Sequence, residues 1–491
     1  MGGLRATRLA AIVVAGLLAV PIALEEIGIP SSALGLGAPP AGAASPPASV
    51  RSIQHVVVLM LENHAYDTYF GTYCTRLGPY CAYPADGLPA RTCVPLDPTN
   101  ASAGCVKPFA FTSANDSLSA ILWHNWYSSH SAYDNGTNAN FYLAETSGLT
   151  PFGHYDGTTA PLYWDLAEEY GLGDQFFSPA LSYSLPNHWY LVAAQSPSQI
   201  DVNPVGPGPP NLPIPAPAMS YLNQSNHTPS AEDLLSARGV SWKMYDYALP
   251  SYATAIRTPT GAGVASAYDF WNPEGAKAES YTAAFTSHFV NRSSIFPDAR
   301  SGRLPSVSWV IPDFTYSDHP PSSVSDSEYF TARLVDALES SPEWNSTALF
   351  ITWDEYGGFY DHVVPPTVDS NGWGFRVPLL VVSPYAREGY VSHVNESFPS
   401  ILHFIEDRFN LGCLTAEDCN ATLPLDYFDF NSTARAPIIF PTNVSRMHYP
   451  LPLQNGPKME LWGPLDDPAF DPAIFDGTTN ATDAQFLWPG D

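Results

Sequence analysis

The sequence predicts an α/β fold in three layers, with a mostly parallel central sheet between two layers of helices. Short, strongly apolar runs have the length of buried strands and lie at His55–Leu61, Val307–Ile311, Ala348–Trp353 and Val377–Val382. Amphipathic segments of helical length alternate with them, at Ala160–Tyr170, Ala231–Arg238, Ser327–Ser340 and Phe398–Phe409. Strands that alternate with helices in this way are typical of a parallel sheet covered on both faces.

Length and composition limit the possible classes of protein. The 491 residues can form one large α/β domain with insertions, or two domains. An apolar fraction of 45% is ample for a core, so a largely disordered chain is excluded. With 20 basic and 48 acidic residues the net charge is −28, a surface that repels polyanions. Nucleic acid and anionic membranes are therefore not expected as the main partners.

The N-terminus has the form of an export signal. Arg5 and Arg8 precede an uncharged apolar stretch, Leu9–Leu24, which is short for a membrane-spanning helix. Residues 1–24 are therefore expected to be a signal peptide or an N-terminal membrane anchor, and both alternatives stay open. A Pro/Ala/Gly-rich linker follows at 25–50.

Cysteines and glycosylation signals also indicate export. The chain has six cysteines, an even number that favours disulfides in an oxidising compartment, and no Cys-x-x-Cys pair supports the zinc alternative. Cys413 and Cys419 form a natural local pair, and the other four (Cys74, Cys81, Cys93, Cys105) allow three connectivities. Twelve Asn-x-Ser/Thr sequons predict a glycosylated surface. We expect an extracellular or cell-surface protein.

The main domain is expected over residues 51–411. Within it, residues 196–229 are dense in proline and lack periodicity, which indicates a surface insertion. Residues 412–491 are rich in Pro and Asn, and are expected to form an irregular C-terminal extension packed on the main domain.

Two of the predicted strands end on metal-capable side chains. Glu62-Asn63 follows the first strand, and Asp354-Glu355 follows Ala348–Trp353. Because ligands bind beyond the carboxyl ends of strands in open α/β sheets, these side chains are expected to form an oxygen-rich cation site. Each pair alone could instead be a helix cap or an exposed turn. Gly357-Gly358 favours the cation site, since glycines let the backbone turn sharply beside the carboxylates.

Further candidate residues lie between these two strands. Ser184 opens a Pro-Asn turn that ends at His188, for which the alternative is an ordinary loop. His124 and His130 lie upstream, where the alternative is a pair of ordinary helix histidines. His319 precedes two prolines, which stiffen its loop.

Together these segments resemble the bacterial and archaeal phosphoesterase family that includes phospholipase C and a secreted acid phosphatase. The hallmarks of that family are Glu-Asn-Arg-Ser-Phe-Asp-x-Tyr-Phe-Gly after a strand, a Ser/Thr-x-Pro-Asn-Arg turn, and Asp-Glu-x-Gly-Gly-Phe-x-Asp-His. They stand here as Glu62–Gly71, Ser184–His188 and Asp354–His362, and Arg376–Pro384, Gly389–His393 and Ser400–Glu406 also match. The resemblance spans about Ser52–Leu411, and it is the ordered set of motifs that makes it specific.

The resemblance implies an alkaline-phosphatase-like fold and a metal-dependent phosphoesterase acting on phosphate mono- or diesters. It implies one divalent metal ion, with Mg, Ca, Mn, Zn and Fe all open, held by Glu62, Asn63, Ser184, Asp354 and Glu355. Ser184 would also be the nucleophile, and His124 and His319 would lie beside the phosphoryl group. His130, His188 and His362 would bind the substrate, a soluble phosphate ester or a phospholipid head group.

The chain departs from the family pattern at two arginines. His64 replaces the Arg after Glu-Asn, and His188 replaces the Arg that ends the Pro-Asn turn. Losing two guanidinium groups removes bidentate phosphate contacts or structural pairs, so we expect altered specificity. Two other functions remain open: a sulfatase with the same fold, for which Cys93-Val94-Pro95-Leu96-Asp97 lacks the final Arg, and a non-catalytic surface glycoprotein.

Overall fold

The computed structural model describes most of the chain between residues 50 and 440. The described residues are 50–78, 81, 83–113, 122–144, 148–196, 228–246, 273, 285–368 and 372–440. The expected signal or anchor at 1–24 and the linker at 25–49 lie outside them, as do nearly all of the proline-rich insertion and the chain after Phe440. Within the described part, no helix combines the length and the apolar character needed to cross a membrane.

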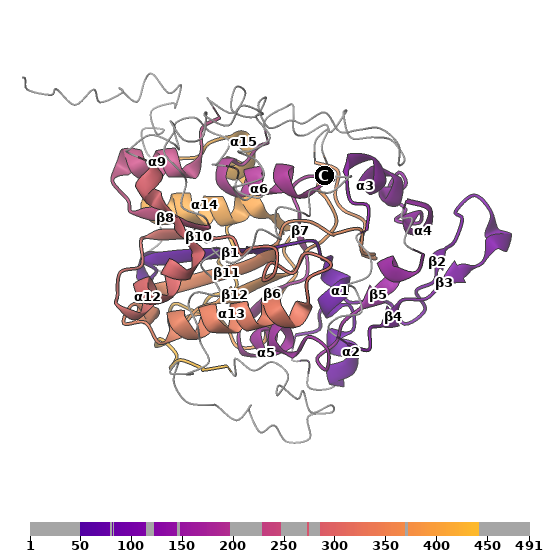
Figure 1. Ribbon diagram of the computed structural model, residues 1–491, viewed down its shortest axis with the longest axis horizontal. Coiled ribbons are helices and arrows are strands. Elements are labelled where there is room, and N and C mark those ends of the chain that lie inside the picture. The colour runs from indigo at the N-terminus through magenta and orange to yellow at the C-terminus, as the bar shows by residue number, and fades with distance from the viewer. Residues whose placement is uncertain are drawn as a thin grey trace, which may run out of the picture.

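The centre of the molecule is an eight-stranded sheet with the order β13-β6-β12-β11-β1-β10-β8-β9 (Figure 1). Its strands are β1 (His55–Leu61), β6 (Gly171–Gly173), β8 (Trp242–Asp246), β9 (Phe289–Asn291), β10 (Val307–Val310), β11 (Thr347–Trp353), β12 (Leu379–Val382) and β13 (Tyr390–Ser392). Among these eight strands, only β12 runs against the others, because it pairs antiparallel with both β11 and β6. The expectation of a mostly parallel sheet is therefore confirmed.

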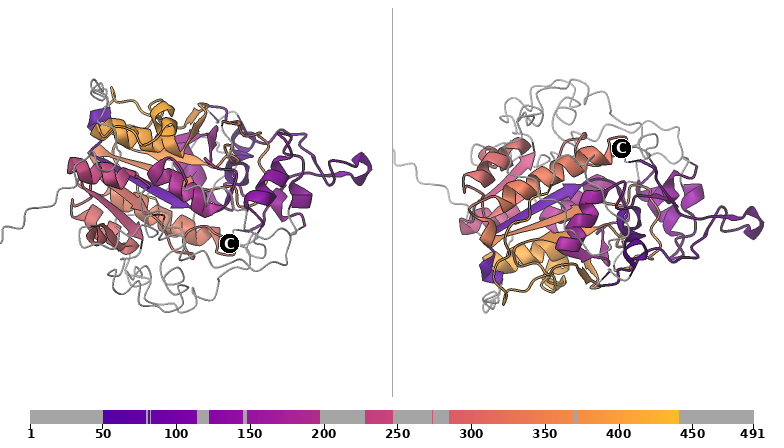
Figure 2. Two further views of the ribbon diagram at one scale, coloured as in Figure 1. Left: turned by 90° about the horizontal axis from the view of Figure 1, so that it is seen from above. Right: turned by 90° about the horizontal axis from the view of Figure 1, so that it is seen from below.

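Helices cover both faces of the sheet, which confirms the three-layer α/β arrangement (Figures 1 and 2). One layer contains α6 (Ser184–Ala193), α9 (Ala231–Arg238), α14 (Phe398–Phe409) and α15 (Ala416–Asn420), which contact one another around α14. The other contains α5 (Pro161–Glu169), α12 (Ile295–Arg300) and α13 (Val324–Glu339), which contact one another around α13. The predicted helices agree with α5, α9, α13 and α14 to within a few residues.

The two central strands explain where the polar strand ends meet. Every residue of β11, and every residue of β1 after His55, is buried, as expected for apolar strands covered on both faces. The two strands run parallel in a register that places Leu61 opposite Trp353. Glu62 and Asp354 are the next residue of each strand, so they leave the sheet side by side.

Smaller elements gather beyond this edge of the sheet (Figure 1). They are α1 (Tyr66–Phe70), α2 (Tyr73–Leu77), α3 (Trp126–Tyr133), α4 (Phe141–Ala144), β2 (Val94–Pro95), β3 (Cys105–Val106), β4 (Phe109–Ala110), β5 (Gly153–His154), β7 (Phe176–Phe177) and β14 (Glu396–Ser397). All six cysteines are paired, as Cys74–Cys81, Cys93–Cys105 and Cys413–Cys419. The expected disulfides, including the local Cys413–Cys419 pair, are confirmed, and the zinc alternative is wrong.

The described end of the C-terminal region lies against α13. Its backbone N–H groups donate to two buried carboxyls of that helix: Ile438 to Glu339, and Phe440 to Asp336 at 2.8 Å. Burial raises the pKa of Glu339 to about 8 and that of Asp336 to about 7.

These two carboxyls predict a fall in stability as the pH rises. The pKa values of these carboxyls are higher in the folded protein than in the unfolded chain. At pH values between the unfolded and the folded pKa, the folded state therefore binds more protons than the unfolded chain. Their contribution is complete below about pH 4 and is lost as the pH rises through 8. We expect thermal unfolding of the wild type to occur at a higher temperature at pH 5 than at pH 8. Glu339→Gln should flatten that dependence by on the order of 1–2 kcal/mol, and an unchanged slope would contradict the assignment.

Candidate active site

The carboxylates at the ends of β1 and β11 form the floor of the site. Glu62, Asp354 and Glu355 are fully buried. The N–H of Asp354 donates to the carbonyl of Leu61 at 2.9 Å, which continues the pairing of the two strands by one residue. The sheet therefore holds three acidic side chains in place, because their backbone is anchored by strand pairing.

Asn63 and Gly357 bring the two strand ends into close contact. Asn63 has φ 60°, and its N–H donates to Asp354 Oδ1 at 2.7 Å. Gly357 has φ 62°, and its N–H donates to Glu355 Oε2 at 2.8 Å. A Cβ on Gly357 would lie 1.9 Å from the carbonyl oxygen of Asn63, so only glycine fits there.

We expect Gly357→Ala to damage both stability and the site. The substitution combines a left-handed backbone with a direct clash, so the loop must move. The expected loss is about 2–4 kcal/mol in the free energy of unfolding, measured by denaturant titration. Gly372→Ala is a matched control, because Gly372 has a similar φ of 64° but no atom lies within 4 Å of the place that its Cβ would take. A Gly357→Ala loss no larger than that of Gly372→Ala would contradict the proposed close approach.

Ser184 reaches this cluster from the first turn of α6. Its Oγ donates to Asn63 Oδ1 at 3.3 Å and is buried. Asn187 secures the turn that presents it: Asn187 Oδ1 accepts from the N–H of Ala180 at 2.9 Å, and Nδ2 donates to the carbonyl of Tyr183 at 3.0 Å. The Pro-Asn turn seen in the sequence is thus part of a helix start, and its amide fixes the position of the serine.

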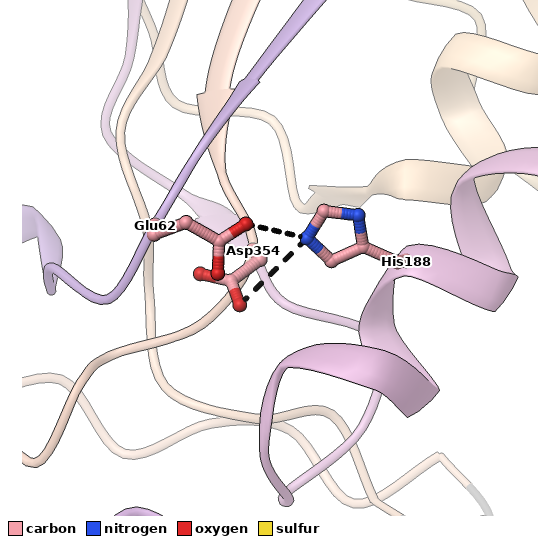
Figure 3. A group of neighbouring side chains, drawn as sticks. All are labelled: Glu62, His188 and Asp354. Atoms are coloured by element: carbon pink, nitrogen blue, oxygen red, sulfur yellow. Dashed lines mark hydrogen bonds and ion pairs between the residues drawn. The ribbon is translucent and has the colours of Figure 1, made fainter. Parts of the chain in front are cut away.

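His188 lies one helical turn after Ser184 and faces the same side. Its Nε2 is 2.7 Å from Glu62 Oε1 and 4.0 Å from Asp354 Oδ2 (Figure 3). Glu62, His188 and Asp354 offer ligand atoms within 4.8 Å of one another, and all three are buried. The ring of His188 lies directly against the carboxylates, and its expected role in substrate binding stays a prediction.

His124 and His319 border the cluster on another side. His124 Nε2 is 3.4 Å from Asn63 Nδ2 and 3.9 Å from Glu355 Oε1, and the two imidazole rings are 6.3 Å apart. The Nδ1 atom of His124 is 2.7 Å from the carbonyl of Leu122, and that of His319 is 2.6 Å from the carbonyl of Pro320. Since a carbonyl only accepts, each of these Nδ1 atoms carries a proton. Burial, and then the nearby His124, lower the pKa of His319 to about 3.

His130 and His362 contact other residues than those of the Glu62–Asp354 cluster. His130 lies on α3, where its ring stacks on Trp126 at 3.9 Å and its Nδ1 is 2.7 Å from the carbonyl of Trp126. His362 lies 2.7 Å from Asp67 Oδ2 in a second group of titratable side chains. The contacts that the structure shows for these two histidines do not join them to the Glu62–Asp354 cluster, and their role in substrate binding stays a prediction.

A buried arginine network behind the site was missed by the sequence analysis. Arg376 Nε donates to Asp361 Oδ1 at 2.9 Å, and Nη2 donates to Asp67 Oδ1 at 3.1 Å. This network connects the segment after β1 with the segment after β11 and with β12. Its three residues lie far apart in the chain. Asp67, Asp361 and Arg376 were visible as parts of three separate motifs, and only their shared location explains why each motif contains a charge.

The electrostatics of the floor favour a bound cation. Burial raises the pKa of Asp354, with smaller opposing effects from hydrogen bonds with Glu62 and Ser184. Clustered buried carboxylates are unfavourable unless a counter-charge compensates them. Three carboxylates, one amide oxygen and one hydroxyl make a donor set that suits a divalent cation. The residues present therefore fit the metal ion implied by the sequence resemblance.

Comparison with known proteins identifies the family. The profile of the Phosphoesterase family matches residues 53–412. This chain belongs to the Phosphoesterase family. Membership confirms the expectation of a hydrolase acting on phosphoric esters.

Curated relatives of this phosphoesterase include bacterial phospholipases C. The chain is 31% identical over 405 residues to phospholipase C B of Mycobacterium tuberculosis, which covers 73% of this chain and 74% of that one. It is 30% identical to phospholipase C A of the same organism, over 73% of each chain. It is 27% identical to a non-hemolytic phospholipase C of Burkholderia pseudomallei, over 74% of this chain and 56% of that one.

Among solved structures the likeness is weak. A protein of the alkaline phosphatase superfamily from Vibrio parahaemolyticus has a TM-score of 0.35 and 12% identity, over 75% of this chain and 71% of that one. A TM-score of that size establishes nothing further about this phosphoesterase.

Proposed function

We propose that this protein is a cation-dependent phosphoesterase in which Ser184 is the nucleophile. The observation that supports this most directly is the convergence of the Ser184 hydroxyl with Asn63 and with the carboxylates after β1 and β11. A serine hydroxyl is a weak nucleophile unless its pKa is lowered, and this cluster can hold the cation that lowers it.

The ligands of the cation would be Glu62, Asn63, Ser184, Asp354 and Glu355. A divalent ion held there would lower the pKa of the Ser184 hydroxyl and offset the negative charge of the phosphoryl group. Ser184 lies in the first turn of α6, where the helix dipole also favours negative charge. Both effects favour the alkoxide of Ser184 over its neutral hydroxyl.

The reaction would proceed in two displacements at phosphorus. Ser184 Oγ attacks the phosphorus atom in line with the leaving alcohol, the P–O bond to that alcohol breaks, and a phosphoserine forms. Water then attacks the phosphoserine and releases the phosphate product. The proton that Ser184 loses would pass to the leaving alcohol, and the proton that the attacking water loses would pass to Ser184 Oγ as the phosphate product is released.

His124 and His319 are the proposed proton carriers and phosphoryl contacts. Each Nδ1 donates to a backbone carbonyl, so Nε2 is the nitrogen of each ring proposed to exchange protons with the substrate. A neutral His319 can take a proton from the attacking water. An anionic phosphoryl group beside His319 would raise the pKa of its imidazole, which would let the ring hold that proton and return it.

The proposed substrates are phosphate diesters of the phospholipase C type, and phosphate monoesters second. The similarity to curated phospholipases C over about three quarters of their length supports the diesters. The proposed location is outside the cell, either secreted or held by an N-terminal anchor. The disulfides are consistent with an oxidising compartment, and glycosylation of the sequons belongs to the same proposal.

A substrate panel with and without a chelator tests this function. We expect release of phosphocholine from phosphatidylcholine vesicles, or of phosphate from a chromogenic monoester, that stops in chelator and returns when a divalent cation is added. The preferred substrate distinguishes a phospholipase C from an acid phosphatase. Turnover that continues at the same rate after complete demetallation would overturn cation dependence.

The structure argues against one alternative, and metal analysis tests the other. The sulfatase-like candidate noted in the sequence, Cys93, is bonded to Cys105 and is therefore closed to conversion into formylglycine. A non-catalytic glycoprotein would have no need of a stoichiometric cation. The metal content of the purified protein therefore separates that alternative from the proposed enzyme.

A further inference from the structure

One residue beside the proposed cation site differs from the family pattern and changes the chemistry available there. The Pro-Asn turn of this family ordinarily ends in arginine, and this chain has His188. An arginine at this place can pair with carboxylates but cannot ligate a metal, because a guanidinium offers only donors. An imidazole offers a nitrogen lone pair and is the side chain most often bound to metals.

His188 lies within reach of the two carboxylates that would hold the cation. Its Nε2 lies 2.7 Å from Glu62 Oε1 and 4.0 Å from Asp354 Oδ2, and its side chain is almost entirely buried (Figure 3). Atoms that share a cation at metal–ligand distances of about 2.0–2.2 Å lie roughly 3–3.5 Å apart. The two observed separations bracket that value, and all three ligand atoms lie within 4.8 Å of one another, so modest side-chain movements would bring them to one ion.

We propose that His188 Nε2 is a further ligand of the cation and that it shifts the preference of the site towards a nitrogen-binding metal such as Zn²⁺ or Fe²⁺. Carboxylate and amide oxygens alone suit Mg²⁺, Ca²⁺ or Mn²⁺, whereas imidazole favours the later transition metals. This inference rests on the proposed function, in which Glu62 and Asp354 hold a cation. It concerns which ion they hold.

The competing role for His188 is to orient Glu62 through a hydrogen bond without touching the ion. The two roles differ in what glutamine can replace. The side-chain amide of Gln places an N–H near the position of Nε2, so His188→Gln keeps a donor to Glu62 and removes the imidazole nitrogen. If His188 only orients Glu62, His188→Gln keeps that function. If His188 binds the cation, His188→Gln removes a ligand.

The test measures binding of Zn²⁺ and Mg²⁺ to the full-length, demetallated protein. We expect His188→Gln and His188→Arg each to weaken Zn²⁺ binding by roughly tenfold or more, while Mg²⁺ binding is unchanged or stronger. His403→Gln is the matched control, since His403 lies on α14 with its Nδ1 2.7 Å from the carbonyl of Ala421, and it should leave both affinities unchanged. Equal loss for both ions in His188→Gln, or no loss for Zn²⁺, would overturn the inference.

A spectroscopic readout avoids dependence on activity. With Cu²⁺ as the probe, pulsed EPR detects imidazole nitrogens bound to the ion, and His188→Gln should show one fewer than the wild type. An unchanged number of coupled nitrogens in His188→Gln overturns the inference and leaves the proposed phosphoesterase intact. A wild type that binds no stoichiometric cation overturns the cation dependence of the proposed function as well. Far-ultraviolet circular dichroism of both His188 variants confirms that they are folded.

Discussion

Ser184→Ala is expected to abolish turnover while leaving the fold intact. The substitution removes the hydroxyl oxygen that would form the phosphoserine, and loss of a nucleophile costs roughly 10⁴–10⁶-fold in turnover. The side chain is small and the hydrogen bond from its hydroxyl to Asn63 is long, at 3.3 Å, so little stability depends on it. Steady-state hydrolysis of a chromogenic phosphate ester measures the change.

Trapping the covalent intermediate gives an independent check on Ser184. Acid quenching during turnover should preserve a phosphoserine at this position in the wild type, which peptide mass spectrometry locates. Ser182→Ala is the matched control, because Ser182 lies two residues earlier in the same turn, is buried, and has no part in the proposed chemistry. Near-normal turnover in Ser184→Ala, or a phosphoserine found elsewhere, would reject Ser184 as the nucleophile.

Asp354→Asn is expected to have opposite effects on activity and on stability. The amide keeps an oxygen that can accept from the N–H of Asn63, but it removes one of three buried carboxyl groups. A weakened cation site should lower turnover by roughly 10²–10⁴-fold, and metal analysis should show lost occupancy. In chelator, the same variant should melt at a higher temperature than the wild type, because burial raises the pKa of Asp354 and marks its charge as unfavourable without a cation.

A structural carboxylate and a cation ligand at Asp354 would change stability in opposite directions when replaced. A purely structural carboxylate would lower stability when replaced, whereas a ligand held in place for a cation is strained in its absence. Glu328→Gln is the matched control: Glu328 is also fully buried, its pKa is raised well above the usual value by burial, and it accepts from the N–H of Leu162 at 2.8 Å. It should keep full cation occupancy. A drop in melting temperature for Asp354→Asn in chelator would contradict the strained-ligand explanation.

Elements built from local apolar patterns were predictable. β1 begins and ends at the predicted residues, α9 and α14 do as well, and β11 starts one residue earlier than predicted. These segments carry a strand or helix pattern that is complete within a few residues, so no distant contact is needed to identify them. The parts of the sheet that were missed, β6, β8, β9 and β13, are short or polar. Gly171–Gly173 is a strand only because it lies between β12 and β13.

The antiparallel direction of β12 could not be read from the chain. Its residues are as apolar as those of β11, and a buried strand has the same pattern in either direction. The direction is set by the path of the connection from β11, which passes through the loop that contains Gly357 and Arg376. The buried ion network of Arg376 with Asp361 and Asp67 holds that path in place.

The sequence by itself identified the candidate site residues, because local patterns recognise the strand ends and the helix start on which they stand: Glu62, Asn63, Ser184, Asp354 and Glu355. Tertiary structure alone decided how they meet. Parallel pairing of β1 with β11 sets two carboxylates side by side, and α6 brings Ser184 and His188 against them. The physical reason is that the site is built from segments far apart in the chain. Their side chains come together only when the core packs.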